Sequence, residues 1–251
     1  MTRSAIVFEA AGEPLVGSLD SASGTTGLLI VSGGNEVRAG AHRGMALLAA
    51  RLAGDGIPVF RYDRRGVGDS AGINRGNAEG AADLAAALDI FRRHAPVTRI
   101  VAFGNCDAAA LLARAGGTLP IDRLVLANPW LMEESDTLPP AAAIRATYAD
   151  KLRRPSEWRR LLSGGVNLRK LARGVRKSLR AATADTAVIE AIIGWGDRAT
   201  IVLAERDHTA RAFDAAARNR GLRIERIASD SHSFARPGDM AALEDIIRAA
   251  L

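Results

Sequence analysis

Residues 100–111 have the sequence IVAFGNCDAAAL, in which an apolar run changes to an Ala/Leu run at the only cysteine of the chain. The first run predicts a buried β-strand and the second an α-helix, so Cys106 stands at the turn between them. Gly104 and Ala108 lie two residues to either side, and a very tight strand-to-helix turn requires such small residues. This turn would expose Cys106 at the N-terminus of a helix, where the helix dipole favours a thiolate.

A lone cysteine also has a simpler interpretation, because most such residues are small, buried and apolar. The small residues around Cys106 favour a nucleophile instead, provided that the chain supplies an acid and a histidine in that order after it.

The composition is that of a globular domain. The chain has 251 residues, of which 48% are hydrophobic and 25% charged, so one domain can bury a sizeable core. One cysteine cannot form an internal disulfide, and the N-terminal residues lack the apolar segment of a signal peptide. No uncharged stretch approaches transmembrane length, so we expect a cytoplasmic protein.

Short apolar runs alternate with longer Ala/Leu-rich runs, which predicts an α/β fold with a mostly parallel central sheet and flanking helices. The predicted strands, of which the first two form an edge hairpin, are residues 5–9, 14–19, 27–31, 58–62, 99–103, 123–127, 200–204 and 223–227. The predicted helices are residues 43–54, 78–94, 107–115, 209–219 and 239–251.

This alternation stops after Trp130, and residues 131–195 contain no convincing strand. Because the segment is too long for an ordinary connection, we expect an inserted helical cap there, between core segments 1–130 and 196–251. Residues 145–180 carry a net charge of +10, although the whole chain carries only +6. The arginines of the cap could simply face solvent. Alternatively, they could bind an anionic membrane surface, an acidic glycan or an acyl carrier protein.

The loop Ser32-Gly33-Gly34-Asn35 follows the predicted strand 27–31. It is either a plain glycine turn or a loop whose backbone N–H stabilises an oxyanion. In the second case the donors are the amides of Gly34 or Asn35 and of Asp107. The Asp107 carboxylate disfavours a neighbouring thiolate, and if it turns away from the site only its N–H matters.

A glycine-rich turn, DRRGVGDS, occupies residues 63–70. Residues 66–71 also match a dinucleotide-binding fingerprint, but that motif must open directly into a helix, which the glycines at positions 72 and 76 prevent. We expect a structural turn in which Arg64 or Arg65 braces the active-site loops, and we expect neither a cofactor nor a metal.

The chain has four histidines, at positions 42, 94, 208 and 232. Only His232 both follows Cys106 and lies on a loop directly after a late strand, 223–227, although a surface histidine would fit the same loop. Two carboxylates, Glu205 and Asp207, follow the strand 200–204. We favour Asp207 as the acid that orients His232, with Glu205 as the alternative. The substrate pocket is expected to include Trp130, Arg64 and His42.

Taken together, these motifs make the chain similar to the α/β-hydrolase superfamily over its full length. More narrowly, it resembles the exosortase A system-associated hydrolases of the first type. The residues that carry this narrower resemblance are GNCDAA at 104–109, SGGN at 32–35, the 63–70 turn, NPW at 128–130 and SHSF at 231–234. The resemblance implies a bacterial cytoplasmic enzyme linked to surface-protein sorting and exopolysaccharide production. The Cys-His-Asp set also resembles dienelactone hydrolases, which lack a large basic cap.

The predicted function is acyl transfer or hydrolysis of a small-molecule ester, thioester or lactone through a thioester on Cys106. The alternative is a non-catalytic scaffold that keeps this fold and binds an anionic membrane or partner through the basic cap. No recognition motif accompanies the charge, so no nucleic-acid partner is expected.

Overall fold

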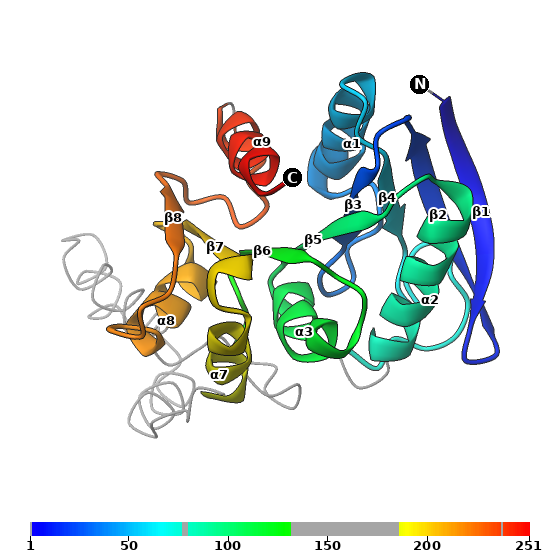
Figure 1. Ribbon diagram of the computed structural model, residues 1–251. Helices are drawn as coiled ribbons and strands as arrows, with labels where there is room; N and C mark the ends of the chain where they lie inside the picture. The colour runs from blue at the N-terminus through cyan, green and yellow to red at the C-terminus, as the bar shows by residue number, and fades with distance from the viewer. Residues whose placement is uncertain (1, 77–79, 132–185, 237) are drawn as a thin grey trace, which may run out of the picture.

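The computed structural model describes residues 2–76, 80–131, 186–236 and 238–251. Its central feature is an eight-stranded sheet in the order β1-β2-β4-β3-β5-β6-β7-β8 (Figure 1). Strands β1 and β2 form an antiparallel hairpin, β2 pairs antiparallel with β4, and the remaining neighbours are parallel. The strands are β1 (Thr2–Ala10), β2 (Glu13–Ser21), β3 (Thr26–Val31), β4 (Val59–Tyr62), β5 (Arg99–Asn105), β6 (Arg123–Ala127), β7 (Ala199–Ala204) and β8 (Ile224–Ile227).

Helices cover both faces of this sheet, as Figure 1 shows. One face packs against α1 (Gly44–Gly54) and α9 (Asp239–Ala250). The other packs against α2 (Gly80–His94), α3 (Asp107–Ala115), α7 (Thr186–Trp195) and α8 (His208–Ala216). The α/β fold with a mostly parallel sheet, predicted from the alternation of apolar runs, is therefore confirmed.

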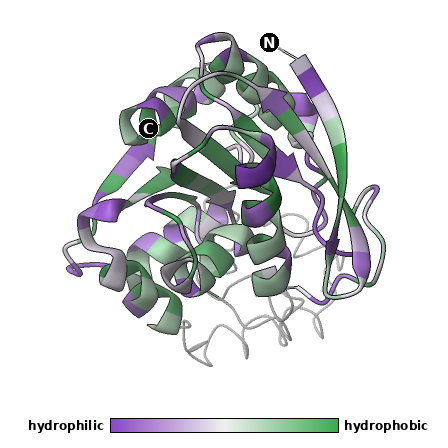
Figure 2. Cartoon of the chain, turned by 45° about the vertical axis from the view of Figure 1, so that its right-hand side comes forward, coloured by the Kyte–Doolittle hydropathy of each residue, from purple (hydrophilic) through white to green (hydrophobic). Residues whose placement is uncertain are grey.

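The central strands are apolar on both faces because helices cover both. In β3, β6 and β7 nearly every residue is buried, and the strands appear as a hydrophobic band through the middle of the molecule (Figure 2). Such continuous apolar runs are easy to locate in a sequence, and all eight strands occur where they were predicted, with ends that differ by a few residues.

Most of the predicted cap, residues 132–185, lies outside the described part of the chain. The last ten residues of the predicted cap, 186–195, form α7, which belongs to the core. Val188, Ile189 and Ile192 are buried there, and the Trp195 indole N–H donates to the carbonyl of Ala113 in α3 at 3.1 Å. Helix α7 therefore packs with the core.

No helix within the described ranges is both long and apolar enough to cross a membrane.

Candidate active site

Cys106 occupies the single residue between β5 and α3, with a strained backbone at φ 61° and ψ −124°. Its N–H donates to the Ala127 carbonyl at 2.9 Å, and its carbonyl accepts from the Trp130 N–H at 3.1 Å. A Cβ added at Gly104 would lie 2.9 Å from the Ala108 carbonyl carbon, so only glycine fits beside the turn. Hydrogen bonds and close packing thus hold an unfavourable conformation that presents the thiol at the start of α3.

His232 lies on the loop between β8 and α9, and its side chain is 39% exposed. Two side-chain amides, one buried and one half-buried, hold the backbone of this loop from the side of the sheet. The Nδ2 groups of Asn105 and Asn128 each donate to the His232 carbonyl at 3.0 Å. Asn128 also accepts from the Ala204 N–H at 2.9 Å, so one side chain joins the ends of β6 and β7 to the histidine loop.

Asp207 is the N-cap of α8, where its Oδ1 accepts from the Ala210 N–H at 2.9 Å. The same oxygen lies 3.1 Å from His232 Nδ1. Glu205, the alternative acid, has an exposed side chain that contributes no hydrogen bond or ion pair to the described residues around His232. The structure thus brings Asp207 to the imidazole and leaves Glu205 at the surface.

The electrostatics of this cluster favour a charged histidine. Burial lowers the pKa of His232, but hydrogen bonds to Asp207 and Cys106 and Coulombic attraction to both outweigh burial and raise that pKa to about 10. Burial likewise opposes ionisation of Asp207. Its hydrogen bonds with His232 and the backbone at Ala210 and Thr209 prevail, and they hold the pKa below its usual value.

These shifts predict that His232 remains an imidazolium throughout the neutral pH range. A ¹⁵N NMR titration should place its midpoint near 10, and Cys106→Ala should move that midpoint down because one stabilising partner is lost. Because the pKa of His232 is higher in the folded than in the unfolded protein, the interactions of the imidazolium with Asp207 and Cys106 stabilise the fold. This stabilisation is fully present below about pH 6.5, the pKa of an unfolded histidine, and it is lost as the pH rises through about 10. A midpoint near 6.5 that Cys106→Ala does not change would contradict the raised pKa of His232 and its dependence on Cys106.

The loop after β3 lies directly against the turn that carries Cys106. A Cβ added at Gly33 would lie 2.5 Å from the Asn105 carbonyl oxygen and 2.8 Å from Asp107 Oδ1, so only glycine allows this approach. The Gly34 N–H donates to Asp107 Oδ1 at 2.6 Å. The Asp107 carboxylate therefore turns toward the loop and occupies one of the backbone donors expected to bind an oxyanion.

Arg64 connects these two segments. It is 3% exposed, and its guanidinium donates to Asp107 Oδ2 at 2.8 Å and to the Gly34 carbonyl at 2.9 Å. Asn74 also donates to the Gly34 carbonyl, at 3.3 Å. Both sides of the Gly34 peptide are thus held, which gives Arg64 the bracing position expected for one of the two arginines.

Hydrogen bonds made by buried side chains hold the 63–70 turn against the neighbouring segments of the chain. Asp63 is fully buried, and its carboxylate accepts from the N–H groups of Arg38 at 2.5 Å and Asp69 at 3.0 Å. The Ser70 hydroxyl donates to the Asp63 carbonyl and accepts from the Val16 N–H. Residues 72–76, which follow this turn, are not helical.

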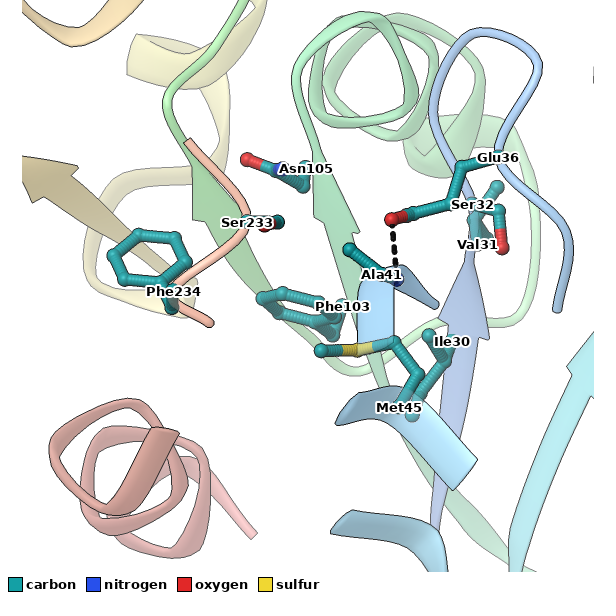
Figure 3. Close-up of a pocket in the computed structure, with 10 residues that line it drawn as sticks. All are labelled: Ile30, Val31, Ser32, Glu36, Ala41, Met45, Phe103, Asn105, Ser233 and Phe234. Carbon is teal, nitrogen blue, oxygen red and sulfur yellow. Dashed lines mark hydrogen bonds between the residues drawn. The ribbon is translucent and has the colours of Figure 1, made fainter. Parts of the chain in front are cut away.

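Glu36 is a residue near the site that the sequence analysis did not identify. It follows the glycine loop, and its Oε1 accepts from the Ala41 N–H at 2.8 Å. Figure 3 shows it at one side of a small pocket whose opposite side carries Asn105 and Ser233 and whose floor is apolar. Burial is the largest influence on Glu36 and raises its pKa; the hydrogen bond from Ala41 and the Coulombic interaction with His232 act in the opposite direction.

The other two expected pocket residues are less closely connected to this cluster. Trp130 is half-buried and contacts the turn through its backbone N–H, which bonds to Cys106. His42 has an exposed side chain on the short 3₁₀ turn Ala41–Arg43, and it is not among the residues that line the pocket of Figure 3.

Comparisons with known proteins agree with this architecture. Solved structures of similar shape include the α/β hydrolase GrgF from Penicillium sp. sh18, with a TM-score of 0.65, 18% identity, and 100% of this chain and 98% of that chain covered. An esterase from Pyrococcus furiosus has a TM-score of 0.65 and 17% identity, with coverage of 99% and 91%. A thioesterase domain from the curacin biosynthetic pathway has a TM-score of 0.63 and 15% identity, with coverage of 99% and 100%.

At these identities the structural likeness shows the fold alone. A search of curated proteins found no match. The sequence nevertheless matches the family model described as the alpha/beta hydrolase family over residues 28–243, which is most of its length. The chain therefore belongs to the alpha/beta hydrolase family.

Proposed function

We propose that this protein is a cysteine-dependent acyl hydrolase or acyltransferase that acts on activated esters, thioesters or lactones. The observation that carries the proposal is the continuous chain from Asp207 through His232 to Cys106. Asp207 binds the Nδ1 side of the ring, which directs Nε2 toward the thiol.

The reaction follows from this arrangement. The Cys106 thiolate attacks the carbonyl carbon, and the π electrons of the carbonyl move onto its oxygen. Collapse of the tetrahedral intermediate breaks the bond to the leaving group, which takes a proton from His232 Nε2 and leaves a thioester on Cys106. His232 then removes a proton from water or an acceptor alcohol or amine, whose attack releases the acyl group and restores the thiolate.

The oxyanion requires two backbone donors, and the contacts around Gly34 favour one of the two loop candidates. The Gly34 N–H is engaged by the Asp107 carboxylate, whereas the Asn35 N–H makes no hydrogen bond to another described residue. We therefore assign the oxyanion to the amides of Asn35 and Asp107, with the Asp107 side chain and Arg64 positioning the loop.

Asp107→Ala should consequently lower kcat/KM for an activated ester by roughly tenfold, because it removes a charge-assisted hydrogen bond that anchors the loop. Asp107→Asn should lose less, since its amide oxygen can still accept from Gly34. A rise in kcat/KM of Asp107→Ala would instead mean that the carboxylate blocks the oxyanion site and that Gly34 is the true donor.

The resemblance to the exosortase A system-associated hydrolases supports a role beside exopolysaccharide production and surface-protein sorting. This part of the proposal rests on that resemblance alone.

Turnover of matched acyl donors tests the function directly. The purified chain should consume p-nitrophenyl butyrate and a butyryl thioester, and it should leave the corresponding butyryl anilide intact, because a thiolate favours good leaving groups. If neither ester nor thioester is consumed faster than by Cys106→Ala, the catalytic proposal is wrong and a scaffold role becomes the better explanation.

A further inference from the structure

The outer edge of β1 forms one end of the sheet. Strands β7 and β8, which precede Asp207 and His232, lie at the opposite end, as Figure 1 shows. The strand is nine residues long and pairs with β2 residue for residue, without a bulge. It contains neither proline nor lysine, which natural proteins commonly use to protect a free edge. Val7 is 69% exposed on it.

The hairpin geometry determines which backbone groups point outward. The two-residue turn Ala11-Gly12 has positive φ at both positions, so Ala10 and Glu13 form the hydrogen-bonded pair that closes it. Hydrogen-bonded and non-bonded pairs then alternate along the strand. The pairing of Glu9 with Pro14 agrees, because proline has no N–H to donate to β1.

The odd-numbered residues of β1 therefore direct their N–H and carbonyl groups away from β2. They are Arg3, Ala5, Val7 and Glu9. None of these backbone groups bonds to a residue in the described ranges.

The sequence of β1 is complementary to itself when one copy runs antiparallel to another with Ile6 on the two-fold axis. In this register Arg3 faces Glu9 of the second copy, and Ala5 faces Val7 of the second copy, each pair occurring twice. All of these pairs join odd-numbered residues, whose backbone groups are the ones that point outward. Opposite charges and apolar side chains thus meet each other, as stable cross-strand pairs require.

Sliding the register by two residues in either direction removes both charge pairs. Arg3 uses part of its guanidinium to bind Asp20 and the Ala46 carbonyl, and an arginine has five donors, so others stay available for Glu9. Glu9 is exposed and has no ion pair with any described residue.

We propose that the outer edge of β1 is an interface with a second copy of this chain, which joins two eight-stranded sheets into one continuous sheet. The complementarity of Arg3 and Glu9, together with the parity of the outward backbone groups, supports a second copy over an unrelated strand. The interface lies away from the catalytic cluster, and it does not depend on the proposed reaction.

Sedimentation equilibrium tests the interface. The wild-type protein should be a dimer at about 100 µM, and Val7→Pro should weaken that dimer at least tenfold. Val7 directs its N–H outward, so proline there removes an interface donor and no bond to β2. Val7→Thr is the matched control and should remain dimeric. A monomeric wild type, or a dimer that Val7→Pro leaves unchanged, would overturn the proposal.

Cross-linking tests the register. In a Cys106→Ala background, Ile6→Cys should form an intermolecular disulfide on oxidation, because residues on the axis form a non-hydrogen-bonded pair with Cα atoms about 4.5 Å apart. Ser4→Cys is the matched control, since its counterparts in the dimer would lie more than about 10 Å apart. Equal cross-linking by the two variants, or none by Ile6→Cys, would contradict this register.

Discussion

Cys106→Ala is expected to reduce kcat/KM for an activated thioester by at least about 10³-fold, close to the level left by substrate binding and the oxyanion donors alone. The thiol is the only nucleophile that the turn between β5 and α3 presents to His232, and alanine supplies no atom to form the acyl intermediate. Stopped-flow or steady-state hydrolysis of a butyryl thioester measures the loss.

The matched variant Cys106→Ser separates loss of the nucleophile from damage to the turn. Its hydroxyl has a similar size but ionises far less readily beside an imidazolium, so it should retain a small activity that exceeds that of Cys106→Ala. Circular dichroism should show both variants to be folded. Activity of Cys106→Ala within tenfold of wild type would exclude a cysteine nucleophile.

Asp207→Asn is expected to reduce kcat/KM by about 10²- to 10⁴-fold, because its amide can donate to Nδ1 and hold the ring in the wrong tautomer. Asparagine is as good an N-cap as aspartate, so α8 should keep its start and the folded state should change little. The loss therefore reports on the orientation of His232 and not on stability.

Glu205→Gln is the control for this prediction. The Glu205 side chain is exposed on the same loop, so its neutralisation should change kcat/KM by less than about twofold. A large loss in Glu205→Gln, with Asp207→Asn near wild type, would reverse the assignment of the acid. The two variants change charge equally, so any difference between them comes from position.

The fold was predictable because buried parallel strands leave a strong signal. Residues 124–127 and 201–204 are apolar throughout, and the structure pairs both runs in the interior of the sheet. Local sequence does not separate helix α7 from the insertion. This helix follows a long basic segment, and the contact of Trp195 with Ala113 that ties it to the core joins residues far apart in sequence.

Spacing along the chain predicted which elements carry Cys106, His232 and Asp207, because the C-terminal ends of neighbouring parallel strands meet at one edge of the sheet. It could not predict side-chain direction. The Asp107 carboxylate points to Gly34, and Asn128 supports the histidine loop. Glu36, which follows the glycine loop, lines the small pocket of Figure 3. Each of these contacts depends on how separate loops pack together, which local sequence does not encode.

Intact-mass analysis of the protein mixed with an activated acyl thioester tests the central claim most directly. The proposed mechanism predicts a covalent adduct with the mass of the acyl group, located on Cys106 by peptide mapping. The adduct should be absent from Cys106→Ala and should persist longer in Asp207→Asn, where His232 activates water poorly. Turnover of the thioester by wild type with no adduct, or with the acyl group on another residue, would contradict a Cys106 nucleophile.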